Sequence, residues 1–217
     1  MTVNLKNKAY QLIKERIMTC EYGPNSFLNE ADLIQEIDAS RTPIREALNK
    51  LEQEGLVQII PKKGVMVTGL TLTEINQTFE ARLLLEPFII SNYMDALDDQ
   101  MLQKVEEETK RLLDAEPSPP DFCRLDDYFH RQISAACPNR YFKEMLAHIY
   151  DQNQRIRLFS GRDLWERHIE AHREHLELIR YLRNGQKEEA VAALTLHLIK
   201  SKEAAIKTLI EKAIPVV

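Results

Sequence analysis

The hydrophobic positions in the first part of the chain predict three short helices. From Leu5 to Thr19 they recur at intervals of three and four residues, which is the spacing of one helical face. Asn29 can cap a second helix over Glu30 to Ile37. A third helix follows the tight turn at Asp38 to Ser40 and ends before Gly55, so this part of the chain is expected to be helical with short connections.

Two short apolar runs follow the third helix. The first spans Val57 to Ile60 and the second Val65 to Val67, and the basic turn Pro61-Lys62-Lys63-Gly64 separates them. Apolar, β-branched runs on both sides of a turn predict a β-hairpin. We therefore expect a first domain, residues 1–70, with three helices and a two-stranded hairpin.

Residues 71–217 show only helical periodicity and predict an all-helical bundle. The expected helices run at about Thr73 to Tyr93, Gln100 to Leu113, Asp121 to Ala136, Tyr141 to Phe159, Leu164 to Arg183 and Lys187 to Lys212. Breaks are expected at residues 116–120, Cys137 to Asn139, Ser160-Gly161 and Asn184-Gly185. The chain is therefore predicted to be mainly α, with two domains.

The third helix of the first domain has an apolar side and a polar side. At 100° per residue the apolar side carries Ile44, Ala47, Leu48 and Leu51, and the polar side carries Arg41, Thr42, Arg45, Glu46 and Asn49. Ser40 or Thr42 can cap the helix, and Pro43 is tolerated in its first turn. Two guanidiniums one turn apart at a helix start suit phosphates and guanine edges, although a solvated face is the alternative.

The hairpin strengthens the DNA-binding interpretation. Its turn places Lys62, Lys63 and Gly64 at a basic tip, where glycine permits close approach to a sugar-phosphate backbone. A short helix, a tight turn, a polar-faced helix and a basic hairpin, in this order, predict a winged helix-turn-helix with the third helix in the major groove.

Charge, cysteines and hydropathy narrow the class of protein. The chain has 29 Lys and Arg against 34 Asp and Glu, yet each sign numbers nine up to Thr68, so the first domain is neutral and can bind DNA through one basic face. Cys20, Cys123 and Cys137 are scattered and form no CxxC pair, which predicts reduced thiols. No apolar run of about 18 residues and no secretory signal is evident, so we expect a cytoplasmic protein without membrane contact.

Four residues of the second domain have the spacing of a metal site. Asp126 and His130 lie four apart on one helical face, although a surface pair is the common alternative. Gly185 lies 10 residues after His175 and 12 before His197, so an antiparallel helical hairpin brings both histidines to nearly the same level. Three imidazoles and one carboxylate suit Zn, Ni, Mn or Fe and leave coordination positions for another group.

The other histidines are assigned different roles. His168 and His172 precede His175 at helical steps but lack the acidic residue of an HExxH motif, so we expect them to be solvated or to cap. His148 lies in an apolar-rich helix and is expected to be a hydrogen-bonded core or boundary residue. Trp165 and Tyr128 line a pocket or simply pack.

Several segments resemble one family of bacterial regulators. The stretch SRTPIREALNKLEQEGLV closely resembles the signature of the GntR family of transcription regulators, and LNEADLIQEIDA resembles its first helix-turn-helix helix. FEARLLLEP, LDDYFH and EHLELIRYLRNGQ resemble the helical effector domain, FCD, of the FadR branch. The resemblance implies DNA contacts by Arg41, Thr42, Arg45 and Gly64, and a divalent metal held by Asp126, His130, His175 and His197.

Two positions depart from the family pattern. Ala31 stands where some relatives carry an arginine that contacts DNA, so the operator sequence stays open. Asp38 replaces a common turn glycine, and we expect it to adopt a left-handed backbone.

The predicted function is a homodimeric transcription regulator rather than an enzyme. Residues 71–217 would bind the metal and the effector and form the dimer, and DNA contacts by Asn49, Lys62 and Lys63 complete the predicted double-stranded operator site. The resemblance implies a small carboxylate effector on the metal, with Arg82 as a second anchor unless it only pairs with Glu86. The alternative is a helical metal-dependent enzyme with a nucleic-acid tether, but no nucleophile with a neighbouring base stands out.

Overall fold

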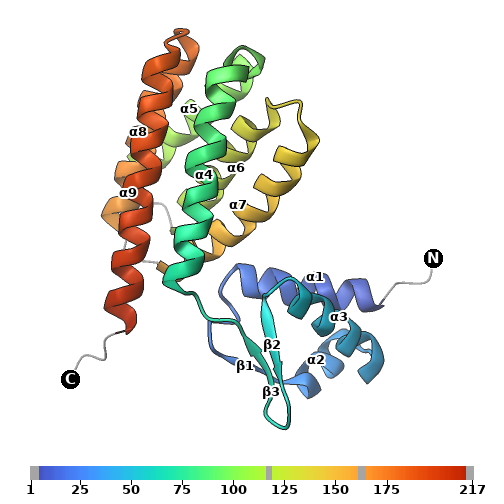
Figure 1. Cartoon of the computed structure of the whole chain (residues 1–217). Helices are drawn as coiled ribbons and strands as arrows, with labels where there is room; N and C mark the ends of the chain where they lie inside the picture. Colours follow the sequence, from blue (N-terminus) through green and yellow to red (C-terminus); the bar gives the residue numbers. More distant parts are fainter. Residues whose placement is uncertain (1–4, 116–118, 161–164, 214–217) are drawn as a thin grey trace. The chain divides into compact units, whose positions relative to one another are not determined.

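The computed structural model describes residues 5–115, 119–160 and 165–213, which belong to two compact units. The first unit ends at Leu70 and the second begins at Thr71 (Figure 1). The predicted break at Gly161 and the predicted helix start at Leu164 lie outside the described residues. The mainly α fold with a small sheet in the first unit confirms the predicted fold class.

The first unit combines three helices with a small antiparallel sheet. Its elements are α1 (Leu5–Met18), β1 (Phe27–Leu28), α2 (Glu30–Ile37), α3 (Arg41–Gln53), β2 (Val57–Ile60) and β3 (Gly64–Val67). The predicted hairpin is present as β2 and β3, and a third strand joins it, because β1 pairs with β3. Two residues are too few to show a period-2 pattern, so the sequence did not predict β1.

Local backbone chemistry sets the limits of α2 and α3. The Asn29 side chain accepts a hydrogen bond from the Ala31 N–H (3.0 Å), which confirms the predicted cap of α2. Asp38 has φ 55° and ψ 54°, the expected left-handed conformation. Ser40 occupies the N-cap position of α3, but its side chain makes no cap hydrogen bond, and Gly55 follows the helix with φ 73°.

The core of the first unit holds α3 by its apolar side. Buried side chains of α1 and α3 pack together: Ala9, Ile13 and Ile17 from α1, and Ile44, Ala47, Leu48 and Leu51 from α3. Leu33 and Ile37 of α2 and Val65 and Val67 of β3 also belong to this core. The polar side of α3 is therefore left exposed.

The second unit is a helical bundle. It contains α4 (Leu72–Tyr93), a 3₁₀ turn η1 (Met94–Ala96), α5 (Asp99–Asp114), α6 (Pro119–Ala135), α7 (Arg140–Ser160), α8 (Trp165–Arg183) and α9 (Lys187–Ala213). Thr71 and Glu74 form a reciprocal capping box that begins α4. Figure 1 shows α4 and α9 side by side, and α8 packs against α9. The core includes Ile89 and Ile90 of α4, Phe129 and Ile133 of α6, and Leu178 and Leu194 of α8 and α9.

The bundle positions side chains of α4, α6, α8 and α9 around one interior point. Gly185, with φ 69°, lies in the turn that joins α8 to α9. None of the helices in the described ranges is both long and apolar enough to cross a membrane.

Candidate metal centre and nucleic-acid interface

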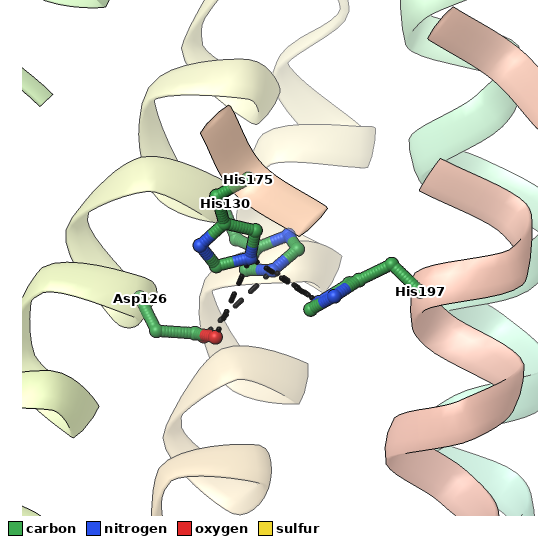
Figure 2. Close-up of side chains that lie close together, drawn as sticks. All are labelled: Asp126, His130, His175 and His197. Atoms are coloured by element: carbon green, nitrogen blue, oxygen red, sulfur yellow. Dashed lines mark hydrogen bonds and ion pairs between the residues drawn. The ribbon is translucent and has the colours of Figure 1, made fainter. Parts of the chain in front are cut away.

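Asp126, His130, His175 and His197 converge inside the second unit. Figure 2 shows their side chains pointing toward one another from three helices, α6, α8 and α9. All four are buried, and one potential ligand atom from each lies within 4.8 Å of the others. The α8–α9 hairpin thus brings His175 and His197 to the same level, as the position of Gly185 indicated.

The distances between the donor atoms fit a single ion. The Nε2 atom of His197 lies 3.3 Å from the Nε2 atoms of both His130 and His175. Asp126 Oδ1 is 3.6 Å from His175 Nε2, and Asp126 Oδ2 is 3.7 Å from His130 Nε2. Ligands about 2.1 Å from an ion at tetrahedral angles are about 3.4 Å apart, so these four groups suit the donor spacing of a metal centre.

Two glutamates fix the orientation of the histidine rings. His130 Nδ1 donates to Glu86 Oε2 (2.7 Å), and His197 Nδ1 donates to Glu174 Oε2 (2.8 Å). These directions follow because each carboxylate is ionised and can only accept. Although burial opposes ionisation, Arg82 and His130 lower the pKa of Glu86 to about 2. Likewise, against burial, hydrogen bonds from His197 and Arg167 lower the pKa of Glu174 to about 2.

The ring orientation directs lone pairs into the centre of the cluster. A neutral imidazole that donates through Nδ1 carries its lone pair on Nε2, and the Nε2 atoms of His130 and His197 lie 3.3 Å apart. Two lone pairs at this distance repel unless a cation lies between them. The donor set of three imidazoles and one carboxylate therefore fits a divalent ion, which would be held by Asp126, His130, His175 and His197.

The protonation states of the other ligands suit metal binding. Burial would raise the pKa of Asp126, but Arg157 and then the neighbouring histidines hold it well below its ordinary range. Burial, reinforced by His197, lowers the pKa of His175, and burial lowers the pKa of His197 to about 4. Ligation requires an ionised carboxylate and neutral imidazoles, and the lowered pKa values favour these forms for Asp126, His175 and His197.

A small cavity of about 40 Å³ adjoins the cluster. Its polar lining includes Arg82, Asp126, Asn153, Arg157, Arg167 and His168. Arg82 is 1% exposed and its Nε donates to Glu86 Oε1 (2.6 Å), so the predicted ion pair with Glu86 is present. Arg82 Nη2 has no hydrogen-bond partner among the described residues. Arg82 therefore both supports Glu86 and presents a free N–H group at the cavity.

Sequence reasoning did not assign roles to several residues around the cluster. Glu174, the neighbour of His175 in the chain, forms a hydrogen bond with His197. Arg167 in turn donates a hydrogen bond to Glu174. Arg157 forms an ion pair with Asp126, 31 positions earlier in the chain. The spacing of these residues in the sequence does not predict the ion pair, because only the packing of α6 against α7 brings the two side chains together.

Three histidine assignments from the sequence were wrong. His168 and His172 were expected to be solvated or to cap, but they are 5% and 1% exposed. Their spacing with Ala171, His175 and Leu178 is that of one buried helical face, and this was the available signal. His148, expected in the core or at its boundary, is exposed on α7.

The two aromatic residues left open by the sequence have distinct surroundings. Trp165 packs edge-to-face against Phe122, with ring centroids 5.4 Å apart. Tyr128 lines a separate groove between α5 and α6, beside Lys104 and Leu125. Neither residue lines the cavity at the metal-ligand cluster.

The polar side of α3 is exposed in the first unit. Arg41, Thr42, Arg45 and Asn49 all face solvent within this unit. Arg45 Nε lies 3.7 Å from Glu30 Oε2, and the Arg45 side chain is 69% exposed, so this ion pair is weak. The Ser40 side chain makes no hydrogen bond to the first N–H groups of α3. This arrangement is suited to phosphates and base edges.

The turn between β2 and β3 presents the basic tip. Lys62 and Lys63 are exposed, and the backbone has positive φ at Lys62 (64°) and Gly64 (109°). Positive φ is readily adopted by Gly64 but is uncommon for a lysine. The tip therefore offers two ammonium groups and an accessible glycine backbone from one tight turn.

Comparison with known proteins identifies the class that this fold and these sites define. Residues 5–67 match the model for bacterial regulatory proteins of the gntR family, and residues 77–200 match the FCD domain. The chain therefore belongs to the GntR family of bacterial transcription regulators and carries an FCD domain. It is a DNA-binding regulator and not an enzyme.

Relatives of similar length support this membership. The chain is 28% identical to the HTH-type transcriptional regulator YdhC of Bacillus subtilis over 87% of this chain and 85% of YdhC. It is 22% identical to the HTH-type transcriptional repressor RspR of Escherichia coli, over 94% and 90% of the two chains.

Two solved structures are informative about the fold. A GntR regulator from Rhodococcus sp. RHA1 has a TM-score of 0.82 at 18% identity and covers 93% of this chain and 97% of its own. The Zn²⁺-bound FCD domain of the protein TM0439 has a TM-score of 0.55 at 27% identity and covers 65% of this chain and 97% of its own.

Proposed function

We propose that this regulator represses transcription by binding a two-fold symmetric operator as a homodimer, and that a small carboxylate on a buried divalent metal controls its affinity for DNA. The ion would be Zn, Ni, Mn or Fe, held by Asp126, His130, His175 and His197 in the cytoplasm of a bacterial cell. Arg82 would be the second anchor of the acid. The repressor role is supported by the relative RspR, which is named a repressor.

The observation that carries this proposal is the convergence of the Nε2 atoms of the three histidines and the Asp126 carboxylate inside the bundle. Glu86 and Glu174 hold the rings of His130 and His197 so that these atoms meet at 3.3 Å inside a buried site. A divalent ion satisfies them, and four protein ligands leave positions for an exogenous oxygen ligand. The Zn²⁺-bound FCD domain of TM0439 supports the same assignment.

The first unit would supply the operator contacts. Arg41, Thr42, Arg45 and Asn49 would face the major groove, because α3 is held by its apolar side alone. Lys62, Lys63 and Gly64 would contact phosphates beside it. A dimer places two such units on two half-sites, so a change in their spacing would alter operator affinity.

For binding of the acid to change the affinity for DNA, the acid must bind two states of the regulator with different affinities. The cavity beside Asp126 is lined by α4, α6, α7, α8 and α9, so an acid there contacts five helices of the bundle. Rearrangement of these helices would reposition the two DNA-binding units of the dimer.

The proposal is tested by measuring operator affinity with and without metal and acid. An operator is first selected from a random DNA library, and its dissociation constant is measured by fluorescence anisotropy. Acetate, lactate, succinate and citrate are added in turn to zinc-loaded and to chelated protein. We expect at least one acid to change the dissociation constant by about 5-fold or more in the zinc-loaded protein only. No response to any of these acids, or an equal response after chelation, would contradict the proposal.

A further inference from the structure

Two polar side chains that are not among the four proposed metal ligands, Arg167 and His168, line the cavity beside the cluster. Arg167 Nη2 donates to Glu174 Oε2 (2.7 Å) and to the Ser201 hydroxyl (3.1 Å). Arg167 Nε and Nη1 are buried without a hydrogen-bond partner among the described residues, and Nη1 lies 3.8 Å from the exposed Glu170. His168 is 5% exposed, and its Nε2 also lacks a partner within the described ranges. Both side chains line the cavity.

Unpaired buried N–H groups indicate a missing acceptor. Leaving such a donor unsatisfied costs about 1–3 kcal/mol, and more when the group is charged. Arg82 Nη2 lines the same cavity and is unpaired as well. Arg82 joins the cluster through Glu86 and His130, whereas Arg167 joins it through Glu174 and His197, so the two guanidiniums belong to different branches of the network.

The charge balance around the cavity favours a ligand with two negative charges when a divalent ion is bound. Each arginine that lines the cavity pairs with one carboxylate that is buried or half-buried: Glu86 for Arg82, Asp126 for Arg157, and Glu174 for Arg167. At the exposed edge, Glu170 beside Arg167 and Lys200 beside Glu174 carry opposite charges. These pairs sum to zero, and neutral imidazoles add nothing. A buried divalent ion would bring two positive charges, which are costly in a low dielectric unless they are compensated. A ligand with two negative charges compensates them.

We propose that the ligand is a short dicarboxylate, with one carboxylate on the metal and the other on Arg167 and His168. This assignment rests on the proposed function and specifies its ligand class. A cavity of about 40 Å³ holds roughly three water molecules, which favours a short chain. Inorganic phosphate has a similar charge on a single anionic centre, so comparison with phosphate separates recognition of charge from recognition of two carboxylates.

The charge requirement is tested first on the unmodified full chain. Malonate and succinate are compared with propionate and butyrate, which have the same chain lengths but one carboxylate, by isothermal titration calorimetry of zinc-loaded protein. We expect each dicarboxylate to bind at least 10-fold more tightly than its monocarboxylate. Equal affinities would overturn the inference while leaving a carboxylate-controlled regulator intact. Failure of all four acids, together with the four of the operator assay, would overturn the proposed function as well.

The Arg167 variants test which group holds the second carboxylate. Arg167→Gln should weaken the binding of malonate and succinate at least 10-fold and change the binding of propionate and butyrate less than 2-fold. Its zinc content, measured by mass spectrometry, should be unchanged. Arg167→Lys should retain part of the affinity, because it keeps the charge but loses the planar fork. Arg173→Gln, on the exposed side of α8, is the matched control.

Two results with these variants would overturn the assignment. If Arg167→Gln lost the same factor in affinity for monocarboxylates as for dicarboxylates, the role of Arg167 would be structural only. Phosphate binding as tight as succinate binding, with the same dependence on Arg167, would show recognition of charge without two separated carboxylates. The comparison of acids on the unmodified chain still decides the ligand class if Arg167→Gln does not fold.

Discussion

Replacement of Glu86 by glutamine should weaken the helical domain and its metal site together. Glu86 is fully buried between Arg82 Nε (2.6 Å) and His130 Nδ1 (2.7 Å). Glutamine has the same shape and can still accept one hydrogen bond, but it leaves the buried Arg82 guanidinium without a counter-charge. Removing one partner of a buried ion pair costs about 3–5 kcal/mol.

The pKa of Glu86 gives a second measure of the same effect. Its pKa is about 2 in the folded protein against an ordinary 4.5, which corresponds to about 3 kcal/mol in favour of the ionised folded form. Because the folded pKa is lowered, this contribution is complete above pH 4.5 and disappears as the pH falls toward 2. Glu86→Gln should therefore lose about 3 kcal/mol of unfolding free energy at pH 7.

The assay is urea denaturation of chelated protein followed by the fluorescence of Trp165. Trp165 is the only tryptophan of the chain and packs against Phe122 inside the helical domain, so it reports on that domain specifically. Zinc affinity, measured by chelator competition, should fall by about 10- to 100-fold, because a neutral amide makes His130 a weaker ligand.

A matched control separates the buried ion pair from a general loss of charge. Glu80→Gln removes an exposed glutamate from the same helix, α4, and should change stability by less than about 0.5 kcal/mol. If Glu86→Gln also changed stability by less than this and bound zinc normally, the reasoning from the Arg82–Glu86–His130 network would be refuted.

Three further predictions concern DNA contacts and pH. Arg45→Ala should weaken specific operator binding by about 1–3 kcal/mol in an anisotropy assay, and an unchanged dissociation constant in the folded variant would exclude a base contact. Lys62→Ala/Lys63→Ala should weaken binding to all DNA sequences alike and reduce the salt slope by roughly 0.9 per lost phosphate contact, whereas an effect at one base position would argue against phosphate contacts. Burial lowers the pKa of both His168 and His197 to about 4. The chelated helical domain should therefore lose stability as the pH falls from about 6.5 toward 4, at about 1.4 kcal/mol per pH unit for each histidine. Urea midpoints that stay constant over this range would contradict this prediction.

The sequence predicted much of the fold because its elements are locally specified. The helices of the second domain follow hydrophobic periodicity and breaks such as Gly185, and their predicted ends lie within two residues of those observed for α5, α7 and α9. The strand β1 has only two residues and exists because β3 offers it a pairing edge. Such pairing is a tertiary property that no short window reveals.

The candidate site was predictable in its ligands but not in their supports. The i, i+4 spacing of Asp126 and His130 and the turn at Gly185 bring the ligands together through helix geometry alone. The contact between Glu174 and His197 depends on the packing of α8 against α9, and that between Glu86 and His130 on the packing of α4 against α6. These contacts need the assembled bundle, so the sequence did not predict them.

The central claim, that the four clustered side chains hold one divalent ion, is tested most directly by zinc stoichiometry. Equilibrium dialysis followed by elemental mass spectrometry should give one zinc per chain in the unmodified protein. The count should be close to zero in His175→Ala/His197→Ala and unchanged in His148→Ala, which removes an exposed histidine of α7. The double variant should still bind DNA through its first domain. One zinc per chain in His175→Ala/His197→Ala, with affinity within 2-fold of the unmodified protein, would contradict the claim and move the ligands elsewhere, with His168 and His172 the first to test.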